Sequence, residues 1–330
     1  MKQCKFNPDE VIFALTSSCN LRCTHCFTNK TPSNLSANDA VKFLEMCRNF
    51  PGNTIEKVGF SGGEPFLNVD FLITVIKYAL DEGFMFDRII TNGAWWKTQE
   101  ELEETLSKIY DAGFDGKIAL SWDSYHNQDT EKMILFCMSV IKIFDGNTLE
   151  IQSVAEKNNM DGENFCFEKK LELLSSKVNG TISKKINKKT GTGFISIQGE
   201  NIFIPVFRTP VTYCASDENA FKSRKWFTDD FCKGPGNILF VHPTGNIAPC
   251  CGFANENKAL FIGKITDSLE TILKNADENK MVRLCYEKGL SKGIKLLKKR
   301  NIPIPGKTDD PCTFCDFFCR ELNGREDFYD

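Results

Sequence analysis

The sequence of 330 residues lacks any apolar run approaching the ~20 residues that a membrane-spanning helix needs. Its first ten residues, MKQCKFNPDE, lack the apolar segment of a secretory signal, so we expect a cytoplasmic protein. It also lacks a basic excess, because 41 Lys and Arg residues stand against 44 Asp and Glu residues. Nucleic-acid-binding proteins usually show such an excess. We therefore expect neither a membrane nor a nucleic acid as a partner.

Cysteine, by contrast, is abundant, with fifteen residues. A reducing cytoplasm does not sustain a disulfide framework, and the odd total also argues against one. Ligation of a metal ion or an iron–sulfur cluster is the better explanation, and the spacing indicates which cysteines take part. We expect only packing roles for the cysteines that follow no ligand spacing, namely Cys4, Cys47, Cys137, Cys166, Cys214 and Cys285.

Short apolar runs alternate with longer amphipathic stretches over the first two-thirds of the chain. The predicted strands are Val11–Thr16, Ile55–Phe60, Phe86–Thr91, Lys117–Trp122, Leu149–Val154 and Asn201–Phe207. The predicted helices are Ser36–Asn49, Val69–Glu82, Gln99–Ala112, Gln128–Phe144 and Asn164–Lys177. This alternation implies parallel strands with right-handed crossovers. Since no strand is followed by Gly-x-Gly-x-x-Gly, we expect an α/β fold with a partial (β/α)6 TIM barrel, whose functional residues follow the strands.

The pattern changes near residue 210. Residues 210–330 are rich in loops, hold eight of the fifteen cysteines and contain the turn signals KGPGN, HPTGN and IPIPGK. We therefore predict two domains, a partial barrel over residues 1–209 and a small C-terminal domain over residues 210–330. The second has little core of its own and depends on a metal site. The segments KKINKK and KGIKLLKKR are interpreted as solvated chain or a helix face.

Three cysteines lie on the segment CNLRCTHC, directly after the first predicted strand. Three close thiolates, from Cys19, Cys23 and Cys26, suit a 4Fe–4S cluster with one iron left without a protein ligand. Structural zinc would require a fourth ligand, and its cysteines usually come as two Cys-x2-Cys pairs. His25 could supply that fourth ligand, so zinc stays open as the alternative.

The Cys-x3-Cys-x2-Cys triplet, with the aromatic His25 before its third cysteine, resembles that of the radical S-adenosylmethionine (radical SAM) superfamily. Three further segments end the next three strands in the order seen in that family, namely Ser61-Gly62-Gly63-Glu64-Pro65, Thr91-Asn92-Gly93 and Ser121-Trp122-Asp123-Ser124. The resemblance implies that the first of them binds the methionine amino group and the last the ribose hydroxyls. It thus assigns cofactor binding to His25, Ser61, Gly62, Gly63, Glu64, Asn92, Ser121 and Asp123.

Two further residues are candidates for binding S-adenosylmethionine, Ser153 on the fifth predicted strand and Arg208 at the end of the sixth. Arg208 could bind a carboxylate of the cofactor or substrate, and Ser153 could contribute similarly; for both, a purely structural role is the alternative. The resemblance implies that a reduced 4Fe–4S cluster cleaves S-adenosylmethionine, and that the 5′-deoxyadenosyl radical then removes a hydrogen atom from a substrate. It also implies an electron-donating partner, a reductase such as flavodoxin or ferredoxin.

Four cysteines in the C-terminal domain have the spacing of a second site. The hairpin VHPTGNIAPC would bring Cys232 and Cys250 to one end, and the pair Cys312-x2-Cys315 would complete the set. Four thiolates fully ligate a 4Fe–4S cluster, with zinc as the alternative. The arrangement resembles the shortened "twitch" form of the SPASM extension, so we expect one auxiliary cluster. Cys319 could replace one of the four ligands.

The chain as a whole resembles radical SAM enzymes that modify ribosomally made peptides, in particular the epimerases with one auxiliary cluster. This resemblance implies a precursor peptide as substrate, conversion of an L-residue to its D-form, and Cys251 as the thiol that returns hydrogen. Packing is the simpler role for Cys251. Three alternatives stay open: a thioether-forming maturase, a twitch-type radical dehydrogenase of a small alcohol, and a non-enzymatic iron–sulfur or zinc scaffold.

Overall fold

A computed structural model describes residues 6–28, 31–155, 160–187, 192–232 and 237–322. The chain divides into two compact units. Unit 1 comprises Met1–Ala14, Phe27–Lys57 and Thr212–Asp330, and unit 2 comprises Leu15–Cys26 and Val58–Val211. The division predicted between residues 209 and 210 stays a prediction. What the structure adds is that the first strand pairs with a C-terminal strand and that the first helix belongs to the same unit.

Unit 2 is built on adjacent strands that follow the order β2 (Lys57–Ser61), β3 (Met85–Thr91), β4 (Lys117–Ser121), β5 (Leu149–Ala155), β8 (Ile202–Pro210), β7 (Gly193–Gly199) and β6 (Thr181–Ile186). Strands β3, β4, β5 and β8 run parallel. Their carboxyl ends therefore lie at one edge of the sheet, where α/β proteins place their sites.

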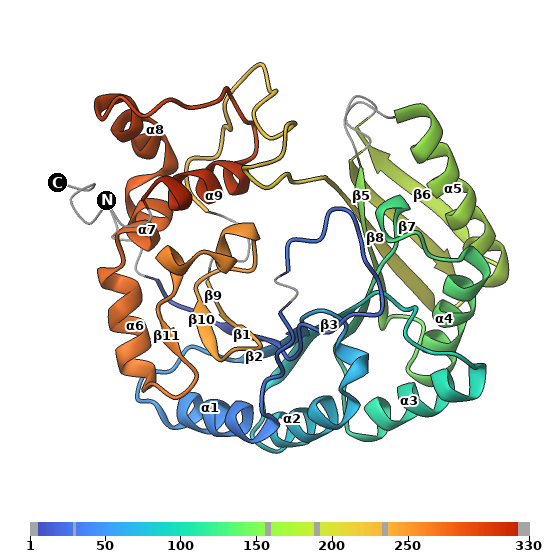
Figure 1. Ribbon diagram of the computed structural model, residues 1–330. Helices are drawn as coiled ribbons and strands as arrows, with labels where there is room; N and C mark the ends of the chain where they lie inside the picture. The colour runs from blue at the N-terminus through green and yellow to red at the C-terminus, as the bar shows by residue number, and fades with distance from the viewer. Residues whose placement is uncertain (1–5, 29–30, 156–159, 188–191, 233–236, 323–330) are drawn as a thin grey trace. The chain divides into compact units, whose positions relative to one another are not determined.

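The helices of unit 2 begin where their capping residues predict. Figure 1 shows them following one another along one side of the strands: α2 (Val69–Asp81), α3 (Gln99–Asp111), α4 (Thr130–Ile143) and α5 (Met160–Lys177). The side chains of Asn68, Thr98 and Asp129 each accept a hydrogen bond from the first turn of the helix that follows. Each predicted helix in this unit is confirmed with shifts of a few residues at its ends.

A β-hairpin, β6 followed by β7, is present that the sequence pattern did not indicate. Residues 184–186 of the lysine-rich segment KKINKK lie on β6, which pairs antiparallel with β7 at the sheet edge. Residues 188 and 189 lie outside the described residues. The lysines of its first half are exposed, as the interpretation of solvated chain requires, but they lie on a strand and not on a helix face. Exposed lysines on an edge strand discourage pairing with other chains, which explains their density here.

Unit 1 holds a smaller group of strands, in which β1 (Glu10–Ala14) runs parallel to β9 (Ile238–Val241) and β9 antiparallel to β10 (Asn246–Ala248), with β11 (Gly263–Lys264) beyond. Phe13 packs edge-on against Phe43 of α1 (Ala37–Asn49), with ring centroids 6.5 Å apart. Since side chains alternate along a strand, Ile12 and Ala14 point to the opposite face of β1. That face carries a separate apolar cluster.

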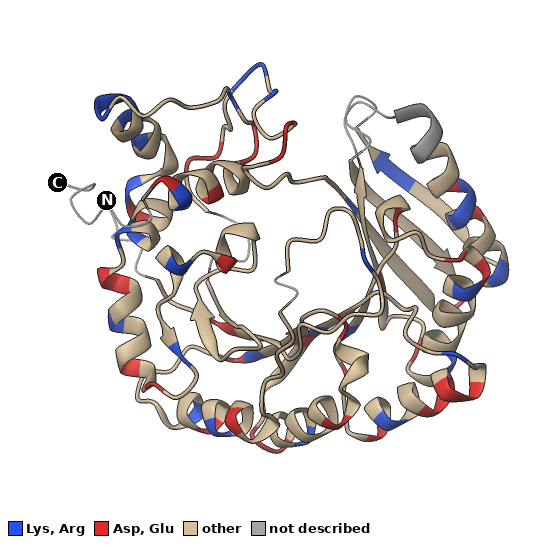
Figure 2. Cartoon of the chain, in the orientation of Figure 1, with Lys and Arg blue, Asp and Glu red and all other residues tan. Residues whose placement is uncertain are grey.

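The C-terminal residues of unit 1 build more core than their loop-rich sequence suggested. The helices here are α6 (Leu269–Glu278), α7 (Lys280–Arg283), α8 (Leu290–Lys299) and α9 (Pro311–Leu322). Ile272, Leu297, Phe314 and Phe318 are fully buried, so the expectation of a poor core was wrong. The segment KGIKLLKKR forms α8, and Figure 2 shows its basic residues gathered on that helix, as predicted. Among the described helices, none is both long and apolar enough to cross a membrane.

Candidate functional site

The first three predicted ligands lie on one short loop of unit 2. Leu21 donates its backbone N–H to Cys19 Sγ at 3.4 Å, and Cys26 donates its N–H to the carbonyl of Cys23 at 3.2 Å. Cys19 and Cys23 are half-buried, whereas Cys26 is exposed. The loop thus makes a backbone turn between Cys23 and Cys26, and its Leu21 N–H donates to the Cys19 sulfur. A donor to sulfur suits a negatively charged cluster.

The predicted glycine segment packs directly against the start of this loop. Gly63 donates its N–H to the carbonyl of Thr16 at 2.6 Å, and Glu64 donates to the carbonyl of Ser18 at 2.8 Å. A Cβ atom at Gly62 would lie 2.6 Å from the oxygen of Thr16, and one at Gly63 would collide with Ser18. Only glycine permits this approach, so the two segments hold one another in place.

Glu64 is fully buried and connects two strand ends. Its carboxylate accepts hydrogen bonds from the Thr91 hydroxyl at 2.8 Å and from the Asn92 N–H, also at 2.8 Å. Burial is the strongest influence on this carboxyl and raises its pKa to about 7, against the lowering effect of these hydrogen bonds. The Asn92 side chain in turn donates to Asn20 Oδ1 at 2.9 Å and lies 3.6 Å from Cys19 Sγ.

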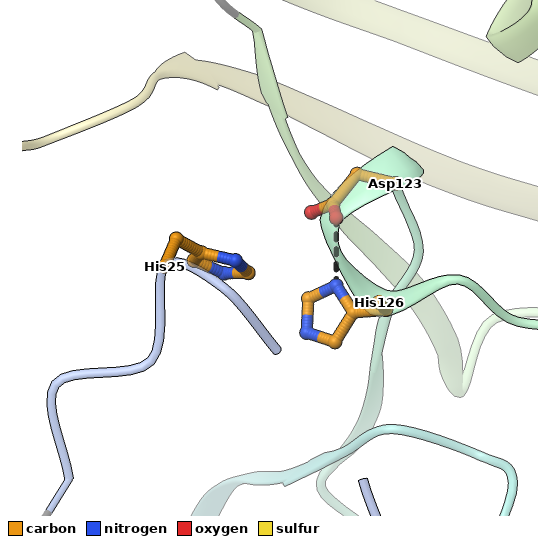
Figure 3. Close-up of side chains that lie close together, drawn as sticks. All are labelled: His25, Asp123 and His126. Atoms are coloured by element: carbon orange, nitrogen blue, oxygen red, sulfur yellow. Dashed lines mark hydrogen bonds and ion pairs between the residues drawn. The ribbon is translucent and has the colours of Figure 1, made fainter. Parts of the chain in front are cut away.

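Asp123, His126 and His25 form a compact group at the end of β4, shown in Figure 3. Nδ1 of His126 lies 2.7 Å from Asp123 Oδ1. Burial alone would lower the pKa of His126, but hydrogen bonds to Asp123 and Cys23 outweigh it and raise the pKa to about 9. Burial would likewise raise the pKa of Asp123, yet the His126 hydrogen bond lowers it. The pair is therefore an ion pair at neutral pH.

The ring of His25 packs against the imidazole of this ion pair. Its centroid is 5.0 Å from those of Tyr125 and His126, both in edge-to-face contact. One ligand atom from each of His25, Asp123 and His126 falls within 4.8 Å of the others, close enough to hold a single metal ion. The same group also offers what an adenosine moiety needs, a carboxylate for hydroxyl groups and flat rings for a base. The residues present therefore fit either group.

Ser153 and Arg208 lie opposite one another on β5 and β8, as the prediction of neighbouring strand ends requires. Both are 3% exposed, and the Arg208 guanidinium lies 4.5 Å from the centre of the Phe167 ring. Within the described residues, the hydroxyl of Ser153 and Nδ1 of His25 are buried with no hydrogen-bond partner. Orphaned buried polar atoms require an explanation, and a bound polar cofactor supplies one.

Gln128 is a residue of this site that sequence reasoning missed. Its Nε2 donates to the backbone carbonyls of Asn92 at 2.6 Å and Ser121 at 2.7 Å. It therefore ties the ends of β3 and β4 together beneath the predicted cofactor residues. Nothing in its local sequence marks this role, because both carbonyls lie on other elements. The residues around the cysteine loop, Asn92, Asp123 and Gln128, thus fit S-adenosylmethionine with a 4Fe–4S cluster.

The second predicted ligand set comes together in unit 1. Negative charge on Cys232 or Cys315 raises the pKa of both Cys250 and Cys312, so these four thiols lie near one another. Burial is the largest influence on Cys250 and Cys312 and raises both pKa values. Such thiols stay protonated unless a metal displaces the protons, so the set fits a cluster. Three further thiols lie near these four, since their pKa values and those of the four affect one another: Cys251, Cys285 and Cys319.

Cys251 is half-buried and has a distinct position. It packs against the apolar cluster of Ile12, Ala14, Ile238 and Phe240. That cluster lies on the face of β1 and β9 opposite to α1. Cys251 therefore packs against β1, the strand that leads in the sequence to the loop with Cys19.

Unit 1 also contains a cavity of about 190 Å³. Phe27, which follows Cys26 in the chain, packs edge-on against Phe253 in its wall, with ring centroids 4.6 Å apart. Asp316 pairs with Arg320 at 3.0 Å, and both line the cavity. Cys214, for which only packing was expected, is half-buried and lines it too.

Comparisons with known proteins extend these observations. The family model described as the radical SAM superfamily matches residues 13–147, and the SPASM model, an iron–sulfur cluster-binding domain, matches residues 232–302. These matches confirm the α/β fold class, a partial barrel-like sheet followed by a C-terminal region of the SPASM type. The SPASM match includes Cys232, Cys250 and Cys251 but ends before Cys312.

Three relatives are similar over different lengths. YydG of Bacillus subtilis (strain 168), whose name assigns it to peptide biosynthesis, is 23% identical over 91% of this chain and 89% of its own length. A GTP 3′,8-cyclase of Chlorobaculum tepidum is 33% identical over 35% of this chain and 33% of its own. The S-adenosylmethionine-dependent nucleotide dehydratase RSAD2 of Oncorhynchus mykiss is 30% identical over 41% of this chain and 36% of its own. The chain thus spans about a third of the last two.

Proposed function

We propose that this chain, a radical SAM enzyme with a C-terminal SPASM domain, converts an L-residue of a ribosomally made precursor peptide to its D-form. The similarity to YydG over 91% of the chain supports a peptide as substrate. The observation that carries the epimerase assignment is the position of Cys251. This thiol neighbours the predicted ligand Cys250 and packs on the side of β1 that faces away from α1.

The residues that would hold the cofactors follow from the site. Cys19, Cys23 and Cys26 would hold the first 4Fe–4S cluster, and Cys232, Cys250, Cys312 and Cys315 the auxiliary one. S-adenosylmethionine would contact the residues around the cysteine loop, namely His25, Ser61, Gly62, Gly63, Glu64, Asn92, Ser121, Asp123, Ser153 and Arg208. When bound, it supplies the radical that removes a hydrogen atom from an unactivated carbon. A reductase such as flavodoxin or ferredoxin would supply the electrons.

The role of Cys251 follows from stereochemistry. A peptide α-carbon that has lost its hydrogen atom is planar, and return of hydrogen to the face just attacked restores the L-residue. Cys251 therefore gives its S–H hydrogen atom to the other face, so that the S–H bond breaks as a new C–H bond forms. Return of the Cys251 sulfur to a thiol needs one electron and one proton; solvent would supply the proton, and an auxiliary cluster held by the neighbouring Cys250 would be the electron donor. The proposal requires this thiol to reach the α-carbon of the bound peptide.

Replacing Cys251 tests this assignment. With a precursor peptide as substrate, Cys251→Ala should retain both clusters and still produce 5′-deoxyadenosine, but should yield no D-residue. The wild-type enzyme in heavy water should place one deuterium at the inverted carbon, because thiol hydrogens exchange with solvent. Chiral amino-acid analysis and mass spectrometry measure both outcomes.

Cys214→Ala is the matched control, since Cys214 is also a half-buried thiol of unit 1. It should epimerise normally. A Cys251→Ala enzyme with normal turnover, or an unlabelled D-product, would reduce Cys251 to packing. A product that has lost two hydrogen atoms would instead indicate a thioether-forming maturase or a dehydrogenase. Failure to release 5′-deoxyadenosine from S-adenosylmethionine under anaerobic reduction would indicate a non-enzymatic iron–sulfur or zinc scaffold.

A further inference from the structure

Two buried thiols outside the predicted ligand set contact Cys315. The sulfur of Cys285 lies 3.8 Å from that of Cys315, within hydrogen-bonding distance for two sulfur atoms. The thiol of Cys319, four residues further along α9, lies on the same helix face and close enough to Cys315 to shift the pKa of both. Cys285 is 6% exposed and Cys319 is 0% exposed, so solvent does not compete for these contacts. Cys315 is therefore bracketed by two thiols.

Cys285 is held by a turn that hydrogen-bonds to the segments of two predicted ligands, and Cys319 by the helix that carries the other two. Cys285 lies on a π-helical turn, Leu284–Lys288, and its carbonyl accepts the N–H of Cys232 at 3.1 Å. The next residue, Tyr286, donates its hydroxyl to the carbonyl of Pro249 at 3.0 Å, one residue before Cys250. Cys319 follows Cys315 by four residues on α9, so the two side chains share one face of that helix. π-helical turns are rare and occur frequently at functional sites.

We propose that Cys285 and Cys319 are hydrogen-bond donors to Cys315 that raise the reduction potential of the auxiliary cluster, rather than ligands of it. This inference rests on the ligand set of the proposed function. A sulfur bound to iron carries no proton and can only accept, so the S–H groups of Cys285 and Cys319 must donate. Hydrogen bonds to cluster sulfurs offset the negative charge that reduction adds. Ligands of one cluster bind separate iron atoms, whereas the sulfur of Cys285 lies only 3.8 Å from that of Cys315.

The test compares alanine variants of the anaerobically prepared full chain carrying both clusters. Cys285→Ala and Cys319→Ala should keep the wild-type iron and sulfide content. In each, a redox titration followed by electron paramagnetic resonance should give a more negative midpoint potential for the auxiliary cluster. The double variant should show the larger shift. Cys285→Ser should shift less than Cys285→Ala, because its hydroxyl still donates. Cys47→Ala removes a buried thiol of α1 in the same unit and should leave the potential unchanged.

Two results would overturn the inference. Loss of about four iron atoms in Cys285→Ala or Cys319→Ala would make that residue a ligand. Wild-type iron with an unchanged potential in both variants would leave these thiols as packing. Cys312→Ala, prepared alongside, distinguishes failure of this inference from failure of the proposed ligand set. If Cys312→Ala keeps its auxiliary iron, the proposed ligand set itself is wrong, whatever the potentials of the other variants.

Discussion

A single buried carboxylate organises the loops around the first cysteine site. Glu64 accepts hydrogen bonds from Thr91 and Asn92 through its side chain, while its own N–H reaches Ser18. The end of β2 is thereby fixed both to the end of β3 and to the loop that carries Cys19. Asn92 then lies where its amide can contact Cys19 Sγ. Positioning of the cysteine loop is thus one role of Glu64, whatever it contributes to the cofactor.

Glu64 should also make stability depend on pH. Burial raises its pKa from 4.5 to about 7 in the folded chain, so the folded state binds this proton more tightly than the unfolded state. The resulting stabilisation is complete below pH 4.5 and is lost as the pH rises through 7. Urea unfolding should show a fall of about 3 kcal/mol in the free energy of unfolding across this range, and Glu64→Gln should remove that slope. Equal slopes in both proteins would contradict this prediction.

Residues at strand ends were predictable from the sequence, whereas residues that bridge elements were not. Asn92 and Asp123 follow their strands directly, and the fold class alone places such residues at the site edge. Gln128 lies near the start of a helix and acts on carbonyls of two other segments. Cys285 follows no ligand spacing, and its contact with Cys315 exists only after unit 1 has folded. Local pattern contains no information on such contacts.

Among the elements, helices were predicted better than edge strands for a physical reason. Ser36 caps α1 by accepting the N–H of Asp39, and this signal is local and visible in sequence. Strand β6 shows almost no alternation of buried and exposed residues, since most of its side chains are exposed at the sheet edge. A strand that buries little carries no period-2 pattern, and its pairing with β7 had no sequence signal.

The glycine segment after β2 provides a test at the level of elements. Gly63→Ala would place a methyl group against the Ser18 carbonyl, so the cysteine loop must move. We expect loss of the first cluster, about half of the total iron, with the auxiliary cluster retained. Gly52→Ala is the control, because no atom lies within 4 Å of the added carbon; Gly52 has a positive φ, which Gly63 lacks, so this variant carries backbone strain without a collision at the cysteine loop. Iron analysis of both proteins checks this, and full iron in Gly63→Ala would contradict it.

Across the whole molecule, the chain passes from one unit to the other immediately before its first predicted ligands. Strand β1 belongs to unit 1, where it pairs with β9, while the loop carrying Cys19 belongs to unit 2. The pairing of Glu10 with Ile238 joins distant parts of the sequence. A single boundary in the sequence cannot separate the two units, because unit 1 contains both the first strand and the last helices of the chain. This is why the grouping of β1 with the C-terminal residues could not be predicted.

The two clusters should be separable by single substitutions in the two units. Cys23→Ala should abolish cleavage of S-adenosylmethionine and leave about half of the iron in place, since the auxiliary thiols are untouched. Cys312→Ala should remove the other half. Anaerobic iron and sulfide analysis measures both, and iron equal to wild type in either variant would contradict the assignment of that ligand.

The same Cys312→Ala protein shows whether metal or apolar packing holds the C-terminal residues. Loss of a metal loosens a module that has little core, but Leu297, Phe314 and Phe318 are fully buried here. We therefore expect limited proteolysis to open only the segments beside the thiols, around Cys232 and Cys251. Helices α6 and α8 should stay resistant, because Ile272 and Leu297 bury their apolar faces independently of any thiol. Complete digestion of residues 212–322 in this variant, with wild-type protein intact, would show that the cluster is what holds this part of unit 1 together.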